Sequence, residues 1–322
     1  MACQSCLLIA AGAIILLFLL KKYMNGGICR LSPNLQGKVA IVTGSNCGIG
    51  YFTALRLAQL GAKVILACRD PTRANKALED LKKTVKDAQV EFIRIDLTKP
   101  SSIKEFVDTF KTKYDRLDIL VNNAGLASET RQLTPEGVEM TFSANHLGHF
   151  MLTLLLTDYL IKSGPSRVVN VASVASRIGK MHWDDLTLEK GYAVMKAYQQ
   201  SKLANVIFAS EFNRRFESKG VKSVSLHPGV VRTEIWRPAW KRPITTALAV
   251  LAYPLIWLFT KSCEQGAQTT LECALIDHDK LKGGAYYTDC VPAKMNPDGK
   301  NEEFGKRLWN KSLELLNMKD IN

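Results

Sequence analysis

The sequence lacks the features by which most strongly basic proteins bind nucleic acid. Its 322 residues carry 43 lysines and arginines against 30 acidic residues, a net charge of +13, yet they contain no zinc-finger, helix-turn-helix or RNP pattern. They also show no internal repeat and no block of like charges. Because the basic residues are spread along the chain, we expect a solvated surface with some attraction to anionic lipid, and no nucleic-acid partner.

Cysteine and histidine are present without the spacing that metal sites need. The eight cysteines include one CxxC, Cys3 to Cys6, which has no second pair to complete a zinc site. His146 and His149 stand three residues apart with no carboxylate partner, and His227 begins a His-Pro-Gly turn. We therefore expect structural histidines, no metal site and a reducing compartment.

A long uncharged run, LLIAAGAIILLFLL, occupies residues 7–20. With the residues before it, the run approaches the roughly 20 residues that a membrane helix needs. The basic residues Lys21 and Lys22 follow the run instead of preceding it, which argues against a cleaved signal peptide. We expect a membrane anchor over 1–24, a polar linker over 25–36, and the rest of the chain in the cytosol, with the endoplasmic reticulum as the expected membrane.

Beyond the linker, the chain alternates short β-branched runs with segments of helical length. The runs that we predict as buried strands are KVAIVT (38–43), KVILAC (63–68), VEFIRI (90–95), LDILVN (117–122) and RVVNVA (167–172). This alternation is typical of an α/β fold of the doubly wound Rossmann type, a parallel sheet with helices on both faces. Toward the end, the pattern predicts helices over 264–276 and 302–316 and a strand near 285–287.

The first predicted strand runs straight into a glycine-rich loop, TGSNCGIG at 43–50, which opens a helix through Leu60. Glycines at this position let the backbone turn tightly and approach a pyrophosphate at the N-terminus of the helix. The spacing is G-x-x-x-G-x-G, and the loop lies between a strand and a helix, as a dinucleotide-binding loop must. The loop therefore predicts a dinucleotide cofactor.

The end of the second predicted strand is where NADP is distinguished from NAD. Arg69 can accept the 2′-phosphate of NADP, and Cys68 brings no negative charge to oppose it. Asp70 could instead take the ribose hydroxyls of NAD, but it precedes Pro71 and a helical stretch, so we assign it as a helix N-cap. The sequence therefore favours NADP(H). Asp96, after the third strand, is either an adenine contact or a turn residue.

Several motifs in order resemble the short-chain dehydrogenase/reductase family. They are the glycine loop, Asn122-Asn123-Ala124-Gly125 after the fourth strand, Ser173 after the fifth, and Tyr198-x-x-x-Lys202. The similarity covers residues 36–235, and the segments LACRD, NHLGHF, SKLAN, HPG and RLW resemble the membrane-anchored retinol dehydrogenases within that family. The resemblance implies one Rossmann-type domain over 37–322.

The resemblance also implies a catalytic set of Asn145, Ser173, Tyr198 and Lys202. Reduction of a carbonyl builds charge on its oxygen, and a phenol can deliver the proton there. A phenol has a pKa of about 10, which we expect the cationic Lys202 one turn away to lower, while Ser173 can hydrogen-bond the substrate oxygen. In the family, the residue at Lys202 also holds the nicotinamide ribose, and the one at Asn145 organises a water relay.

The glycine loop, the NADP-selecting position and the family motifs together predict the residues that contact the cofactor. They are Gly44, Ser45, Asn46, Cys47, Gly48, Ile49, Gly50, Arg69, Asp96, Asn123, Gly125, Lys202 and Thr233. Thr233 belongs to a Pro-Gly-x-x-x-Thr turn that closes over the nicotinamide in the family, and a plain loop turn is its alternative.

Two rivals overlap the predicted catalytic residues. Tyr192 and Lys196 have the same spacing as the predicted pair, but six residues along a helix is a rotation of about 240°, so only one pair can face the cofactor. We expect the later pair to act, because it keeps the family's distance from Ser173 and continues into an apolar helix. Ser176 is the other rival, and Ser173 is favoured because it directly ends the strand.

An apolar stretch over 230–263 departs from the strand-helix pattern and contains the run ITTALAVLAYPLIWLFT at 244–260. A second membrane span is one interpretation, but the run is short for a span and contains Pro254. We predict a substrate lid over 230–263, because the family places its substrate loop here. An apolar lid suits a lipophilic, retinoid-like substrate.

The sequence therefore predicts a membrane-anchored, NADP(H)-dependent oxidoreductase that interconverts a lipophilic alcohol and its aldehyde, by resemblance retinol and retinal, in the reductive direction. Steroid or lipid-derived carbonyls are the alternative substrates, and a non-catalytic NADP(H)-binding membrane scaffold is the alternative class of protein. The lipid bilayer is the expected partner, and a homodimer is compatible with the sequence.

Overall fold

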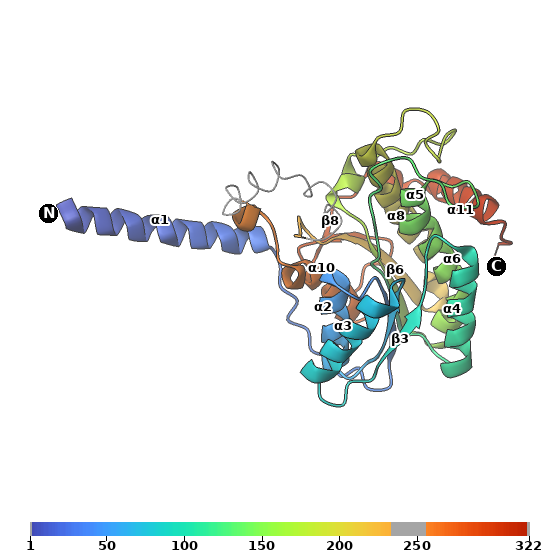
Figure 1. Cartoon of the computed structure of the whole chain (residues 1–322), viewed down its shortest axis with the longest axis horizontal. Helices are drawn as coiled ribbons and strands as arrows, with labels where there is room; N and C mark the ends of the chain where they lie inside the picture. Colours follow the sequence, from blue (N-terminus) through green and yellow to red (C-terminus); the bar gives the residue numbers. More distant parts are fainter. Residues whose placement is uncertain (1, 233–255, 321–322) are drawn as a thin grey trace.

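The chain folds around an eight-stranded sheet (Figure 1) in the computed structural model, which describes residues 2–232 and 256–320. The strand order is β3-β2-β1-β4-β5-β6-β7-β8, and neighbouring strands are parallel except for β7 and β8. The strands are β1 (Val39–Thr43), β2 (Lys63–Cys68), β3 (Val90–Arg94), β4 (Ile119–Asn122), β5 (Ser166–Val171), β6 (Val221–His227), β7 (Tyr286–Thr288) and β8 (Val291–Ala293). The strand order reverses between β1 and β4, the place where such sheets bind ligands.

Helices cover both faces of the sheet (Figure 1). One face packs against α2 (Gly48–Gln59), α3 (Pro71–Thr84) and α10 (Cys263–Leu275), and the other against α4 (Pro100–Lys113), α6 (Gly148–Leu155), α8 (Val194–Phe216) and α11 (Glu302–Leu316). The other helical segments are α1 (Ala2–Asn25), α5 (Met140–Phe142), the π-helix η1 (Ser143–Leu147), α7 (Thr157–Lys162), η2 (Val174–Arg177), η3 (Glu217–Lys219) and η5 (Pro297–Lys300). Successive strand residues alternate between the two cores, as Ile41 and Val42 do.

The predicted α/β architecture is confirmed. The five predicted strands lie within two residues of their expected bounds, and the last helix spans the expected residues. The strand β6 was not predicted, because the serines of VKSVSLH interrupt its apolar pattern. Ser223 is nevertheless fully buried, and its Oγ accepts a hydrogen bond from Asn170 Nδ2 at 3.2 Å, so a polar pair lies inside the core. The strand β8 was missed because three residues are too few to show a period.

The N-terminal helix α1 extends away from the sheet and meets the body at its C-terminal end (Figure 1). Within residues 2–232 and 256–320, no helix is both long enough and apolar enough to cross a membrane. The membrane span expected over 1–24 is therefore not confirmed. Of the predicted lid, the residues from Thr233 to 255 lie outside the described part of the chain.

Candidate active site

The glycine loop and the end of β4 approach each other so closely that side chains would not fit between them. Gly44 has a φ of +64°, and a Cβ there would lie 2.9 Å from Cα of Ala124. A Cβ on Gly50 would lie 2.5 Å from the carbonyl oxygen of Gly44. Asn123 ties the two segments together, because its Nδ2 donates to the carbonyl of Thr43 at 2.8 Å. The contact between the ends of β1 and β4 by itself therefore requires these glycines.

The start of α2 offers backbone N–H groups to an anion. Its N-cap is Cys47, whose side chain makes no capping hydrogen bond, and Gly48 has a φ of +62° with no atom within 4 Å of the position of a Cβ. Helix N-termini with uncapped N–H groups bind phosphate. Ser45 and Ile49 have buried side chains, while Asn46 is half-buried. This arrangement fits a dinucleotide pyrophosphate.

The ends of β2 and β3 carry the groups predicted to select the cofactor. Asp70 is the N-cap of α3, with its carboxylate accepting from the backbone N–H three residues on, so its predicted capping role is confirmed. Arg69 is exposed, and Arg94, which sequence analysis missed, donates from Nε to the Arg69 carbonyl at 3.4 Å. The Asp96 carboxylate accepts from both N and Oγ1 of Thr98, which is the turn role. Its adenine contact stays a prediction.

Asn145 lies within the π-helix η1, a rare geometry that often occurs at functional sites. Its side chain is fully buried and pairs with the backbone of Leu126, accepting from N at 2.8 Å and donating to O at 2.9 Å. Its Nδ2 also donates to Oγ of Ser201 at 3.0 Å. Asn145 therefore joins the loop after β4 to the helix α8, and Ser201 is a member of the site that sequence analysis missed.

Lys202 is buried beneath the loop after β4. Its Nζ donates to the carbonyl of Val171 at 2.9 Å, and burial lowers its pKa to about 8. A Cβ on Gly125 would lie 3.2 Å from Nζ of Lys202 and 3.3 Å from Oδ1 of Asn145. The structure thus brings Gly125, Asn145 and Lys202 to one place, as the resemblance implies.

Tyr198 lies at the same place, with 7% of its surface exposed. Burial raises the pKa of its phenol, and a hydrogen bond with the side chain of Ser173 acts in the opposite direction. The predicted net lowering of this pKa is therefore wrong for the structure, because burial is the largest effect. The rival Ser176 instead donates from Oγ to the carbonyl of Ser173 at 2.6 Å, so it is Ser173 that meets the phenol.

The rival tyrosine and lysine do not form a pair. The helix α8 begins at Val194, so Tyr192 precedes it and shares no helical face with Lys196. The hydroxyl of Tyr192 donates to the carbonyl of Ser128 at 2.6 Å, while Lys196 is half-buried and its Nζ donates to the carbonyl of Gly191 at 3.4 Å. This observation separates Tyr192 and Lys196 from the site.

The three histidines make structural hydrogen bonds, as expected. His149 lies 2.8 Å from Oγ1 of Thr43, and His146 lies 3.0 Å from Oγ of Ser312. Nδ1 of His227 accepts from the backbone N–H of Val174. Burial lowers the pKa of His146 to about 3 and that of His149 to about 4, so both are neutral near neutral pH. In residues 2–232 and 256–320, no cluster of His, Cys, Asp or Glu could hold a metal ion.

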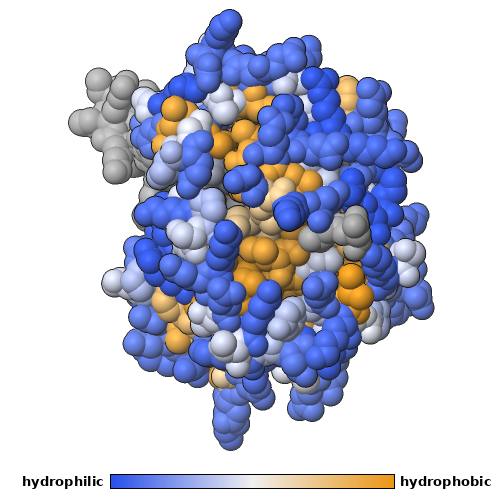
Figure 2. Space-filling view, turned by 90° about the vertical axis from the view of Figure 1, so that its right-hand side faces the viewer, coloured by the Kyte–Doolittle hydropathy of each residue, from blue (hydrophilic) through white to orange (hydrophobic). Residues whose placement is uncertain are grey.

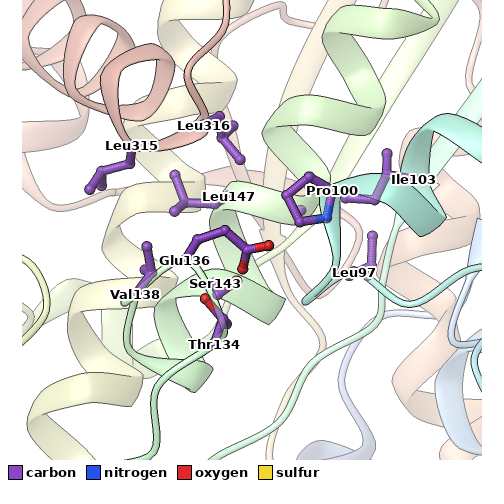
Figure 3. Close-up of a pocket in the computed structure, with 11 residues that line it drawn as sticks. Leu97, Pro100, Ile103, Thr134, Glu136, Val138, Ser143, Leu147, Leu315 and Leu316 are labelled. Carbon is purple, nitrogen blue, oxygen red and sulfur yellow. The ribbon is translucent and has the colours of Figure 1, made fainter.

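A separate, mainly apolar pocket lies between α4, α6 and α11 (Figure 3). Its apolar lining includes Leu97, Ile103, Leu147, Leu315 and Leu316. The carboxylate of Glu136 also lies at the wall of this pocket. The face of the molecule that looks away from α1 carries a strip of apolar residues framed by hydrophilic ones (Figure 2). None of the predicted site residues within the described ranges lines this pocket, so it is separate from the catalytic residues.

Comparison with known proteins agrees with this geometry. Residues 38–243 match the family described as short chain dehydrogenase. The chain is 41% identical over 300 residues to retinol dehydrogenase 12 of Homo sapiens, covering 93% of each protein. It is 40% identical to human retinol dehydrogenase 13, covering 96% of this chain and 92% of the relative. Human WW domain-containing oxidoreductase is 40% identical, with 88% of this chain and 69% of that protein covered.

Solved structures show the same fold. A putative uncharacterized protein from Mycobacterium paratuberculosis is 30% identical, with a TM-score of 0.72 over 91% of this chain and 98% of that one. A putative NAD(P)-dependent gluconate 5-dehydrogenase from Beutenbergia cavernae, solved with bound NADP, is 21% identical with a TM-score of 0.61, covering 80% of this chain and 96% of that one. The second likeness concerns the fold alone.

Proposed function

The chain belongs to the short-chain dehydrogenase/reductase family, whose oxidoreductases use NAD(P)(H), and from this premise we propose that it uses NADP(H) to interconvert a lipophilic alcohol and its aldehyde. Retinol and retinal are the proposed pair, with reduction of retinal as the proposed direction. The observation that carries the proposal is the hydrogen-bonded pair of Tyr198 and Ser173 beside the buried Lys202. The 41% identity to a retinol dehydrogenase supports the choice of substrate.

Each residue has a distinct task in this reaction. When bound, the nicotinamide supplies the hydride. Tyr198 delivers the proton from its hydroxyl to the carbonyl oxygen, and Ser173 donates a hydrogen bond to the same oxygen as charge develops there. Lys202, as a cation beneath Gly125, supports the phenolate that remains on Tyr198. Asn145 holds the loop after β4 against α8 and thereby fixes the position of these groups.

Selection of NADP(H) is proposed to rest on Arg69, with Arg94 beside it. Replacing Arg69 with Gln removes a charge-assisted contact to a 2′-phosphate, so we expect the KM for NADPH to rise about 10–100-fold while that for NADH changes little. Lys83→Gln, on the exposed last turn of α3, is the matched control and should leave both values unchanged. Equal effects of Arg69→Gln on both cofactors would contradict this role.

Membrane attachment through α1 is also proposed, with the catalytic domain in the cytosol on the endoplasmic reticulum. It is supported by the exposed apolar side chains of residues 15–19 and by the basic Lys22 that follows them. A bilayer would supply a lipophilic substrate to a domain held beside it. Steroid or lipid-derived carbonyls remain alternative substrates of the same chemistry.

The decisive experiment is NADPH consumption by the detergent-solubilised full chain with a panel of retinal, steroid ketones and lipid-derived aldehydes. We expect the largest kcat/KM with retinal. A protein that binds NADPH, seen as a change in cofactor fluorescence, but consumes it with no member of the panel would be the non-catalytic scaffold instead.

A further inference from the structure

The C-terminal end of α1 is fixed to the last part of the predicted lid, which covers residues 230–263. We call residues 256–261 the strap. Lys21 Nζ donates to the carbonyls of Trp257 at 2.6 Å and Thr260 at 2.7 Å, and it lies 4.8 Å from the centre of the Trp257 ring. Only 8% of Lys21 is exposed. A lysine at the end of an apolar helix, where it could reach solvent freely, is instead used to hold α1 against the strap.

The strap in turn is hydrogen-bonded to the first residues of the predicted lid, so the two ends of the lid are held together. The N–H of Lys261 donates to the carbonyl of Val230 at 2.7 Å, and the N–H of Arg232 donates to the carbonyl of Lys261 at 3.2 Å. Arg232 also donates from Nη1 to Oγ1 of Thr260 at 3.2 Å. Residues 230–232 and 256–261, the described parts of the predicted lid toward its two ends, therefore both lie at the C-terminal end of α1.

Large apolar side chains are exposed at this junction. The exposed fractions are 81% for Tyr23, 64% for Ile28, 59% for Val230, 45% for Trp257 and 48% for Phe259. We call these five residues the rim. They come from α1, the linker that directly follows it, the segment after β6 and the strap, and the hydrogen bonds above join α1 and the segment after β6 to the strap. Single exposed apolar residues are ordinary, but a group from several segments marks an interaction surface.

We propose that the rim is a membrane-contacting surface, which seats the catalytic domain on the bilayer with both ends of the lid at the lipid. The rim continues the exposed apolar residues 15–19 of α1, and the exposed Lys22 and Arg30 beside it suit anionic headgroups. The acidic Asp289 at the junction is paired with Lys261 at 2.5 Å. Tyrosine and tryptophan are the residues favoured at the interface of membrane and water.

This proposal deepens the proposed function, because it states how a lipophilic substrate would reach the site from the bilayer. Membrane contact through the rim differs from membrane attachment through α1 alone. A membrane anchor alone keeps the domain near a membrane in any orientation. The hydrogen bonds of Lys21 to the strap instead join α1 and the strap into one unit. A unit of this kind can present only one side of the catalytic domain to the lipid.

The test uses the full chain bound to phosphatidylserine/phosphatidylcholine vesicles whose acyl chains are brominated near the headgroup. Bromine quenches tryptophan emission on contact, and the chain has five tryptophans. We expect Trp257→Phe to lower the quenched fraction of the emission. The matched control is Trp183→Phe, since Trp183 is half-buried against Phe304 and Arg307 of α11, and its loss should raise the quenched fraction.

A second readout needs no variant. On vesicle binding, hydrogen exchange should slow in the strap and stay unchanged in α3, which lies away from the junction. Lys21→Gln should weaken the slowing in the strap without releasing the protein from the vesicles. The proposal that the rim contacts the membrane is overturned if the quenched fraction is unchanged or raised in Trp257→Phe. It is also overturned if hydrogen exchange in the strap does not slow on vesicle binding.

Neither readout uses catalysis, so the two proposals fail separately. A chain that does not float with vesicles refutes both membrane attachment and the rim. A chain that floats without quenching of Trp257 is attached by α1 alone, which overturns the rim only. A chain with a quenched Trp257 but no turnover of any carbonyl keeps the rim and refutes the proposed reaction.

Discussion

Two tyrosines stand six residues apart, each followed four residues later by a lysine, and the fold treats them in opposite ways. Tyr198 and Lys202 are 7% and 2% exposed and lie in the interior of α8. Tyr192 precedes the helix and Lys196 reaches solvent. A shared spacing makes a catalytic pair only where a helix includes both residues and the rest of the protein covers them.

The largest effect that sharpens this comparison is expected from removing the two hydroxyls in turn. Tyr198→Phe removes the proposed proton donor, so kcat/KM for retinal should fall about 10²–10⁴-fold. Tyr192→Phe removes a hydroxyl that hydrogen-bonds the carbonyl of Ser128 and the side chain of Thr141, so the activity should stay within about twofold while the free energy of unfolding falls by about 1 kcal/mol. Steady-state kinetics and urea unfolding of the two variants measure both. Comparable activity in Tyr198→Phe and the wild type would reject the proton donor.

Replacing the two lysines should separate activity from stability. Burial lowers the pKa of Lys202 to about 8 from 10.5, so the native state holds fewer protons than the unfolded state between these values. The contribution of Lys202 to the free energy of unfolding of the wild type should therefore rise with pH across this window, and below it the native state carries the whole cost of the buried charge. Lys202→Met removes this dependence, worth up to about 3 kcal/mol. It should also abolish most of the activity.

Thermal unfolding of Lys202→Met and the wild type between pH 7 and pH 10.5 measures this effect. We expect the stability difference between the variant and the wild type to change steadily in favour of the wild type as the pH rises. Lys196→Met is the control for replacing a lysine with methionine in the same helix, because Lys196 also belongs to α8 but is only half-buried. A flat difference for Lys202→Met would show that its ammonium is solvated.

A smaller effect on activity than the loss of Tyr198 is expected from the two serines after β5. Ser173→Ala removes a donor to the substrate oxygen and should lower kcat about 10²–10³-fold. Ser176→Ala loses a hydrogen bond to the Ser173 carbonyl, so we expect an effect below about tenfold through positioning alone. Rapid-quench measurement of the chemical step compares the two. A larger loss of kcat in Ser176→Ala than in Ser173→Ala would show that Ser176, and not Ser173, bonds the substrate oxygen.

Much of the fold could be predicted because its signals are local. Each of the five predicted strands is a short β-branched run, and the C-terminal helix shows its period within its own residues. The strand β6 could not be found this way, because Ser223 becomes compatible with a core only through Asn170, 53 residues earlier. The polar residues of β6 can be recognised as core residues only once β5 and β6 lie side by side.

The residues of the candidate site likewise fall into those that sequence analysis could assign and those that it could not. The glycine loop and the capping role of Asp70 follow from neighbours in the chain, and sequence analysis assigned both. Arg94 and Ser201 were missed, because nothing near them in the sequence shows that they meet Arg69 and Asn145. Such contacts join separate elements, and no single segment contains the information.

The sequence by itself determined the first five strands and their alternation with helices, the glycine turn after β1 and the spacing of Ser173, Tyr198 and Lys202, because these depend on backbone geometry and short-range periodicity. The tertiary structure alone decided which tyrosine is buried, in which direction its pKa moves, and that Lys21 holds α1 to the strap. Burial and hydrogen bonding depend on segments that are distant along the chain, and they exist only once those segments have packed together.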